Sequence, residues 1–257
     1  MKDLTPWTDP QNSSCVHSKK KLQLKGRLSN LFTTLNYMKN IPILYSLQHC
    51  PYAMRARTAL IKARQKVFIR AIKLDNKPQE MLIASPKGSV PVLVLQQKET
   101  NHPLILDESL DIMLWALRQD DPDDLLHQED PQALPLMLSF IVHFEHNFIP
   151  LLESYSCAKR YHDDNLNECR QACEQYLHSL EERLCKHTYL FSDNESLVDI
   201  ALFPFMRKFA KVEKSHFRQS PYPKLRKWLN GYLQGALFSK VMKQHELWIE
   251  CRKDGYL

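Results

Sequence analysis

The sequence predicts an α/β domain, with its elements in the order β-α-β-α-β-β-α, followed by an all-helical domain. Three observations support this fold class. Apolar alternation and helical spacing follow one another along residues 41–120. Four aspartates around Pro122 then form an acidic linker at 120–124. Beyond the linker the sequence keeps helical spacing and shows no convincing strand, and 257 residues are enough for two modest domains.

The first strand is expected at Ile43–Leu47 and the first helix of this domain at about Pro51–Arg64, with Cys50 directly between them. Pro51 takes the first helical position, where its missing N–H removes nothing that the helix needs. The free amides and the positive end of the helix dipole favour a thiolate over a thiol at Cys50. A thiolate attacks disulfides and electrophiles, so this position predicts a reaction class.

Period-two alternation and turn residues mark the other elements of the α/β domain. These are a strand at Val67–Lys73, a helical turn at Gln79–Ala84, strands at Val90–Leu95 and Leu104–Leu106, and a helix from Ser109 to about Arg118. With the last two strands antiparallel, the order is a thioredoxin-like layout.

Helical spacing predicts the second domain. The expected helices are 131–157, 164–187, 196–213 and 223–246. Ser196 and Asp199 form an S-x-x-D pattern, which predicts a capping box, and Pro204 should kink the same helix. We therefore expect an α/β domain at 41–120 and a helical domain at 125–250, after a basic polar extension at 1–40.

The basic charge is concentrated in that extension. The whole chain carries +6, and residues 1–40 alone carry +5, so the remainder is nearly neutral. We therefore expect no nucleic-acid partner. Lys19-Lys20-Lys21 is interpreted as a solvated segment, with an anionic-surface contact or an address signal as the alternative. A short helix is expected at Leu28–Met38.

The sequence predicts a cytoplasmic protein without a metal. No apolar stretch approaches the ~20 residues that cross a bilayer, and the first residues lack the apolar core of a secretory signal. Seven cysteines at irregular spacing indicate free thiols. Cys169 and Cys173, with Cys185 downstream, have no second pair to complete a tetrahedral metal site.

The motif Cys50-Pro51-Tyr52-Ala53 restricts the redox chemistry. A dithiol oxidoreductase would carry a second cysteine where this chain has Ala53, so no disulfide can form within the motif. Redox work at Cys50 must pass through a mixed disulfide with an external thiol, which a second external thiol resolves. The alternative is an inert cysteine at a helix N-terminus.

Five stretches resemble omega-class, glutaredoxin-like glutathione transferases in order and spacing. They are the active-site helix at 50–57, the lysine-bearing loop at 76–78, the segment 85–93 with its cis-proline, the acid-serine pair at 107–109, and the capping box with its Pro-aromatic pair at 196–205. The resemblance spans about residues 41–240. It implies the cytosolic glutathione transferase architecture, a thioredoxin-like domain plus an all-α domain, and a homodimer.

The resemblance also implies a glutathione site. Lys77 would face the glycine carboxylate of glutathione, and a cis bond between Val90 and Pro91 would expose the Val90 backbone to an extended peptide. Glu108 and Ser109 would hold the ammonium and carboxylate of the γ-glutamyl end, since Ser109 can cap the helix that starts there. The alternatives are a solvated Lys77, a trans-proline turn and plain helix capping.

Tyr52, His49 and three phenylalanines are further candidates for the site. Tyr52 is expected to pack near Cys50, with a direct contact to glutathione as the lesser alternative. His49 either lowers the pKa of Cys50 or faces solvent, and the family more often has an apolar residue there. Phe140, Phe144 and Phe148 are candidates for a second-substrate pocket, although their spacing of four also fits an ordinary core.

The expected function is a glutathione-dependent thiol transferase or reductase that works through a Cys50–glutathione mixed disulfide, with glutathione as co-substrate. The second substrate would be a small-molecule or protein disulfide. Dehydroascorbate reduction is the subclass that the resemblance suggests. The alternative is a non-catalytic regulatory or binding protein on the same scaffold, similar to starvation proteins or chloride-channel-like proteins.

Overall fold

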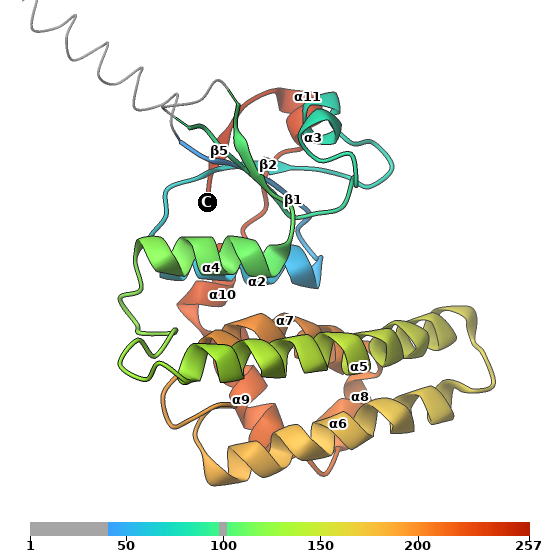
Figure 1. The fold of residues 1–257 in the computed structure, drawn as a ribbon. Helices are drawn as coiled ribbons and strands as arrows, with labels where there is room; N and C mark the ends of the chain where they lie inside the picture. Colours follow the sequence, from blue (N-terminus) through green and yellow to red (C-terminus); the bar gives the residue numbers. More distant parts are fainter. Residues whose placement is uncertain (1–40, 98–101) are drawn as a thin grey trace, which may run out of the picture.

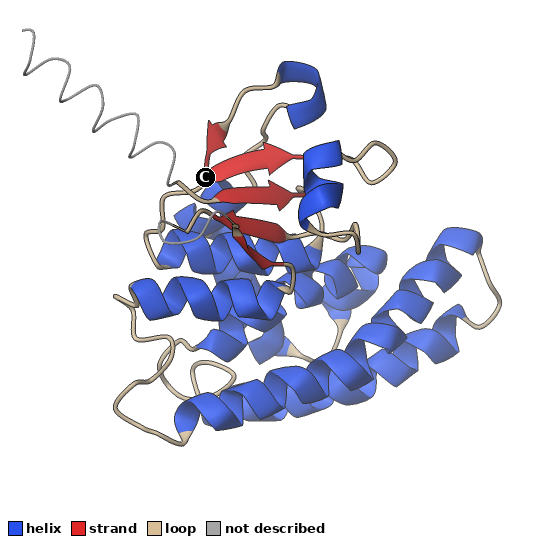
Figure 2. Cartoon of the chain, turned by 45° about the horizontal axis from the view of Figure 1, so that its top comes forward, coloured by secondary structure: helices blue, strands red, loops and turns tan. Residues whose placement is uncertain are grey.

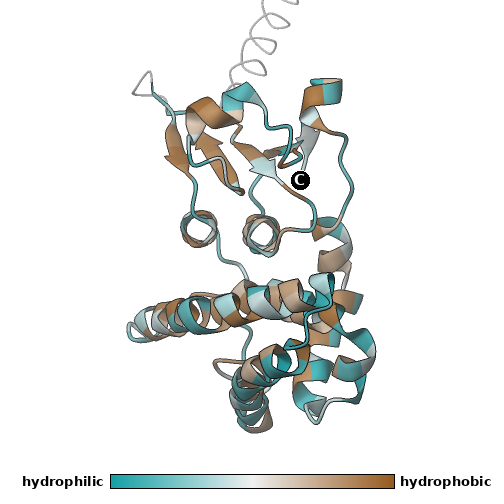
Figure 3. Ribbon diagram, turned by 90° about the vertical axis from the view of Figure 1, so that its right-hand side faces the viewer, coloured by the Kyte–Doolittle hydropathy of each residue, from teal (hydrophilic) through white to brown (hydrophobic). Residues whose placement is uncertain are grey.

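The computed structural model describes residues 41–97 and 102–257. The basic extension and the helix expected at Leu28–Met38 lie outside the described residues. A five-stranded mixed sheet stands above a helical domain, and two helices lie between them (Figures 1 and 3). These helices are α2 (Pro51–Lys62) and α4 (Ser109–Gln119). The predicted fold class, an α/β domain followed by a helical domain, is confirmed.

The sheet has the strand order β4-β3-β1-β2-β5. Strand β1 (Ile43–Ser46) is parallel to β2 (Phe68–Ala71) and antiparallel to β3 (Val92–Leu95), which pairs with β4 (Leu104–Leu106). Because Tyr45 pairs with Val92, the end of β1 lies beside the start of β3. The loops that carry Cys50 and Val90 therefore leave the same end of the sheet.

The fifth strand corrects the prediction that no strand follows the linker. Strand β5 (Gly255–Tyr256) pairs antiparallel with β2, and Leu257 N–H donates to the Val67 carbonyl at 3.3 Å. Asp254 accepts a hydrogen bond of 2.7 Å from Arg70 Nε. Strand β5 thus covers an edge of the sheet that would otherwise present unpaired backbone groups. Two residues are too few to show a period-two pattern.

The helical domain is built on a long pair, α5 (Ala133–Tyr161) and α6 (Leu166–Lys186), that extends beneath the sheet domain (Figure 2). Helix α7 (Leu197–Val212) lies against α5 and also against α2. The helix expected at 223–246 is two helices, α9 (Pro223–Gln234) and α10 (Ala236–Val241), separated by Gly235 in an extended conformation. Two short helices, α8 (Lys214–Gln219) and α11 (Trp248–Cys251), were not predicted.

Helix α2 joins the two domains through one continuous apolar core. Its side chains Met54 and Leu60 are fully buried in a cluster that extends from the sheet to the helices α5, α7 and α9. A smaller cluster on the other face of the sheet contains Tyr45, Met81 and Val90. The position of Cys50 at the start of α2 is therefore fixed by packing on both domains.

The predicted capping box at the start of α7 is confirmed. Asp199 is completely buried, and its carboxylate accepts hydrogen bonds from four donors in three segments. These are the amide of Leu190 (2.9 Å), the amide and hydroxyl of Ser196 (3.0 and 2.8 Å) and Nε1 of Trp228 (3.0 Å). Burial raises the pKa of Asp199 to about 6 against the effect of these donors. The residue ties the loop before α7 to α9.

Glu213, between α7 and α8, ties this junction to α5 and α6 and makes a pH-dependent contribution to stability. Its carboxylate accepts hydrogen bonds from Tyr155 (2.8 Å), Lys159 (3.2 Å) and Arg170 (2.7 Å). Partial burial opposes ionisation, but these three donors lower the pKa of Glu213 from 4.5 to about 2. A lowered carboxylate pKa stabilises the folded state above pH 4.5, and this stabilisation is lost as the pH falls toward 2.

We predict that Glu213→Gln lowers the free energy of unfolding by about 2–3 kcal/mol near pH 7. The difference from the wild-type protein should shrink to about half or less at pH 3, where the wild-type carboxylate loses most of its advantage. Urea unfolding of both proteins at several pH values measures this. Glu168→Gln, an exposed carboxylate at the start of α6, is the control. A loss that stays constant from pH 7 to pH 3 would contradict the prediction.

Candidate active site

The Cys50 thiol lies at the amino end of α2, as the sequence predicts. Cys50 is the N-cap residue, with an extended backbone (φ −70°, ψ 124°), and Pro51 is the first helical residue. The Cys50 carbonyl accepts the first backbone hydrogen bond of the helix, from the Met54 amide at 2.9 Å. The cysteine is free and half-buried, and it packs against the small cluster that contains Val90. A thiol in this place faces the free amides and the positive end of the helix dipole.

Arg57 fixes the loop that precedes the thiol. This arginine is almost fully buried, and its guanidinium donates to Ser46 Oγ at 2.5 Å and to the carbonyls of Leu47 and Gln48 at 3.1 and 2.6 Å. Its Nε donates to the Val241 carbonyl of α10 at 2.9 Å. Burial lowers the pKa of Arg57 to about 10, which keeps it charged at neutral pH. The helical domain thus helps to hold the Cys50 loop in place.

Sequence reasoning did not identify Arg57 as part of the site. The available signal was a charged residue at position i+7 from Cys50, on a helix whose other side is rich in alanine. Positions i, i+4 and i+7 share one helix face. A buried arginine needs acceptors, and those that satisfy Arg57 come from a strand end and from a helix that follows about 180 residues later.

Arg55 brings Ser109 and Tyr52 into one cluster. Its Nε donates to Ser109 Oγ at 2.9 Å, and Nη1 pairs with Glu145 of α5 at 2.5 Å. The guanidinium lies over the rings of Tyr52 and Phe205, at 5.3 and 5.5 Å from their centroids. Arg55 is only 2% exposed, so its partners are required to compensate for its burial. It too was not identified from the sequence.

The role of Ser109 as a helix cap was predicted wrongly. The N-cap of α4 is Glu108, which makes no side-chain cap bond, and Ser109 is the first helical residue. Its hydroxyl is buried and accepts the bond from Arg55. The helix begins at Ser109 as predicted, but the cap is the residue before it, and serine is common both at the cap and in the first turn.

Glu108 is exposed, and its carboxylate pairs with Lys87 of the turn before β3. This pair raises the pKa of Lys87. Both side chains are largely exposed, at 47% for Lys87 and 61% for Glu108, so the pair contributes little to stability. The carboxylate therefore lies at the start of α4 with an exchangeable partner.

The Val90–Pro91 bond is cis, which agrees with the bond that the resemblance implies. Both residues are buried directly before β3. The preceding turn contains Gly88 in the left-handed conformation (φ +63°), and a Cβ built there would lie 3.3 Å from Lys77 Nζ. The structure thus brings the Lys77 ammonium to the turn that leads into Val90.

Tyr52 packs against the helical domain. Its ring meets Phe205 of α7 edge-on, with 4.9 Å between the centroids. Burial raises the pKa of Tyr52, so its hydroxyl stays protonated near neutral pH.

His49 lies on the surface. Its pKa is lowered first by the partial loss of solvent around the ring and then by the positive charges of Arg207, Lys211 and Arg57. His49 is therefore mostly neutral at pH 7.

The three phenylalanines of α5 do not form one pocket beside Cys50. Phe148 is fully buried in the core, and Phe144 is nearly so, stacked on it at 4.8 Å between centroids. Phe140 and Phe144 line a hollow of about 570 Å³ between α5 and α6. Phe148 is thus an ordinary core residue, which was the more conservative interpretation.

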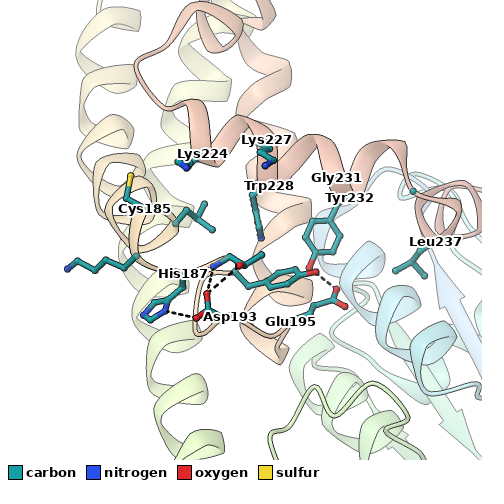
Figure 4. A pocket seen from close by; sticks show the side chains of 15 residues that line it. Cys185, His187, Asp193, Glu195, Lys224, Lys227, Trp228, Gly231, Tyr232 and Leu237 are labelled. Atoms are coloured by element: carbon teal, nitrogen blue, oxygen red, sulfur yellow. Dashed lines mark hydrogen bonds and ion pairs between the residues drawn. The ribbon is translucent and has the colours of Figure 1, made fainter.

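A cavity of about 660 Å³ lies in the helical domain and contains none of the predicted site residues. It is bounded by the end of α6, the loop before α7, and α9 (Figure 4). Trp228 lies in its wall, and the Tyr232 hydroxyl donates to Glu195 at 2.7 Å (Figure 4).

Within 41–97 and 102–257, no group of three or more His, Cys, Asp or Glu residues is arranged to hold a metal ion. No helix there is long and apolar enough to cross a membrane.

Two family models match most of the chain. Residues 44–124 match the model described as "Glutathione S-transferase, N-terminal domain", and residues 138–234 match "Glutathione S-transferase, C-terminal domain". Among curated proteins, "Glutathione S-transferase omega-1" of Mus musculus is 28% identical over 198 residues, which is 76% of this chain and 78% of that protein. The protein of the same name from Sus scrofa is 24% identical over 200 residues, or 77% and 79% of the two chains.

Solved structures show the same fold. A glutathione transferase family member from Pseudomonas fluorescens, solved with two glutathione molecules, superposes with a TM-score of 0.69 at 17% identity, over 79% of this chain and 92% of that chain. Glutathione transferase Omega 2C from Trametes versicolor gives a TM-score of 0.62 at 20% identity, over 80% and 94% of the two chains.

Proposed function

Because this chain belongs to the glutathione S-transferase family, we propose that it is a glutathione-dependent thiol transferase that works through a Cys50–glutathione mixed disulfide. One observation carries this proposal. The only sulfur of the 50–53 motif is a free, half-buried thiol at the amino end of α2, and Ala53 offers no partner for it. The similarity to omega-class relatives supports the same chemistry.

The reaction has two thiol–disulfide exchanges. In the first, the Cys50 thiolate attacks the glutathione sulfur of a mixed disulfide between glutathione and a second thiol. A sulfur–sulfur bond forms to Cys50, and the second thiol leaves as a thiolate that takes a proton from water. A second glutathione thiolate then attacks the glutathione sulfur bound to Cys50. Glutathione disulfide leaves, and the Cys50 thiolate is restored.

The residues around Cys50 support a bound glutathione. We propose that Val90 pairs with its backbone, that Lys77 faces the glycine carboxylate, and that Glu108 exchanges Lys87 for the γ-glutamyl ammonium. The first amides of α4, at Ser109, suit the γ-glutamyl carboxylate. We assign Tyr52 a packing role beside the thiol, with contact to glutathione through its exposed edge.

The proposal extends to the second substrate, the oligomeric state and the location of the protein. Dehydroascorbate, reduced by two glutathione molecules to ascorbate and glutathione disulfide, is a candidate second substrate. We propose a homodimer, on the resemblance to the family, and a cytoplasmic location, which the six free cysteines among the described residues support. The scaffold could instead serve regulation without turnover, and this is the alternative that the next experiment addresses.

We test the proposed function by treating the protein with glutathione disulfide and measuring its intact mass. The expected result is one added glutathione, mapped to Cys50 by peptide mass spectrometry and absent in Cys50→Ser. Cys251→Ser is the matched control, because Cys251 is also half-buried and free. An adduct that maps to another cysteine, or none at all, would favour the regulatory alternative.

A further inference from the structure

Arg207 of α7 is a half-buried arginine whose charge has no acidic partner within the described part of the chain. Its Nη1 lies 3.9 Å from Met54 Sδ, and its guanidinium carbon lies 5.4 Å from the centroid of Phe238. Burial lowers the pKa of Arg207, and no carboxylate among the described residues offsets this effect. By contrast, Arg55 and Arg170, which are also partly or fully buried, each pair with a carboxylate.

The guanidinium contacts α2 at Met54, four residues after the thiol-bearing Cys50. Cys50, Met54 and Arg57 follow one another at spacings of four and three residues, and such positions share one side of a helix. Met54 follows Cys50 by about one helical turn, or roughly 5–6 Å along the axis of α2, so Arg207 contacts the first turn of that helix. Arg207 approaches from the helical domain, between α2 and α10.

The charge around this position is positive. Lys211 follows Arg207 by one turn of α7, and the charges of both residues act on exposed His49, next to the thiol. The acids that could neutralise them from α5 are already engaged, since Glu145 pairs with Arg55 and Glu153 pairs with Lys208 at 2.5 Å. A half-buried cation without a counter-ion gains more from an anionic ligand than a solvated one does.

We propose that Arg207 determines specificity by binding the carboxylate of an anionic thiol or disulfide that reacts at Cys50. This inference rests on the proposed function and adds the substrate class to it. Two molecules could supply the carboxylate: the thiol half of the substrate that faces away from the bound glutathione, or the second glutathione that resolves the mixed disulfide. Both carry the same chemistry, and the experiments below separate them.

The first experiment does not depend on turnover. Iodoacetate and iodoacetamide alkylate the same thiolate with loss of iodide, and only iodoacetate carries a negative charge. Peptide mass spectrometry follows both rates at Cys50. The rate with iodoacetate divided by the rate with iodoacetamide should fall about tenfold in Arg207→Gln at low salt. Arg207→Lys should keep most of the ratio, and Lys227→Gln on α9, an exposed cation that lines the cavity of Figure 4, should keep all of it.

The second experiment uses mixed disulfides of glutathione with three small thiols, namely mercaptopropionate, mercaptoethanol and cysteamine. The wild-type protein should prefer the anionic substrate to the cationic one by about tenfold in kcat/KM, and Arg207→Gln should remove this preference. If the carboxylate belongs to the second glutathione instead, Arg207→Gln should raise the KM for glutathione equally with all three substrates.

The outcomes separate the two proposals. An alkylation ratio that Arg207→Gln leaves unchanged would overturn the inference, whether or not the protein has thiol-transferase activity. A changed ratio without turnover of any of the three disulfides would support an anion site beside Cys50 and would contradict the proposed function. If Arg207→Gln slows both alkylating reagents equally, Arg207 serves packing alone, and the inference is wrong.

Discussion

Removing the sulfur of Cys50 should abolish glutathione-dependent reduction of a small disulfide, with a loss of roughly a thousandfold or more in kcat/KM. No neighbour can replace this sulfur. Ala53 has no functional group, Tyr52 stays protonated because burial raises its pKa, and the next free thiols belong to other parts of the chain. The measurement is the oxidation of NADPH by glutathione reductase, coupled to hydroxyethyl disulfide and glutathione.

Cys50→Ala is the suitable variant because the helix start does not depend on the side chain. Cys50 makes no side-chain cap bond, and Pro51 remains at the first helical position. The free energy of unfolding should therefore change by less than about 1 kcal/mol. Cys251→Ala, the matched control, should keep full activity. Residual activity in Cys50→Ala above a few per cent would place the reaction at another residue.

The largest effect on stability is expected at Asp199. Asp199→Ala should lower the free energy of unfolding by about 3–5 kcal/mol, since it leaves the buried donors of Leu190, Ser196 and Trp228 without an acceptor. These donors belong to the loop before α7, to its capping box and to α9. The variant should thus weaken the attachment of α9 as well as the start of α7, and urea unfolding measures the loss.

Two further variants separate the causes of this loss. Asp199→Asn keeps the size of the side chain and one acceptor oxygen, so it should lose less than Asp199→Ala. Asp164→Ala removes an exposed aspartate from the turn before α6 and should change stability by less than about 0.5 kcal/mol. A loss below 1 kcal/mol in Asp199→Ala would show that water replaces the carboxylate.

The local patterns predicted the elements of the sheet domain well. The strand before Cys50, Pro51 at the start of a helix and the helical turn at Gln79–Ala84 all depend on short-range geometry, and the structure shows each of them. The capping box at Ser196 succeeded for the same reason, because its partners are three residues apart. Such features need no knowledge of the rest of the fold.

The predictions that failed, and the residues that were missed, depend on distant partners. Arg55 and Arg57 looked like two charges on a helix, and only the packed structure supplies their acceptors on α4, α5 and α10. The unpaired charge of Arg207 is likewise visible only when α7 lies against α2. Strand β5 exists because β2 offers it an edge.

The return of the chain to β2 makes the sheet domain discontinuous in sequence. The backbone leaves the sheet after β4, passes through the whole helical domain and comes back through α10 and α11 to residues 255–256. A protease that cut the acidic linker once would therefore leave both fragments bound to one another, through the β2–β5 pairing and the contact of α10 with α2. Even cuts on both sides of the helical domain would leave the two domains in contact through the apolar core that α2 shares with α5 and α7.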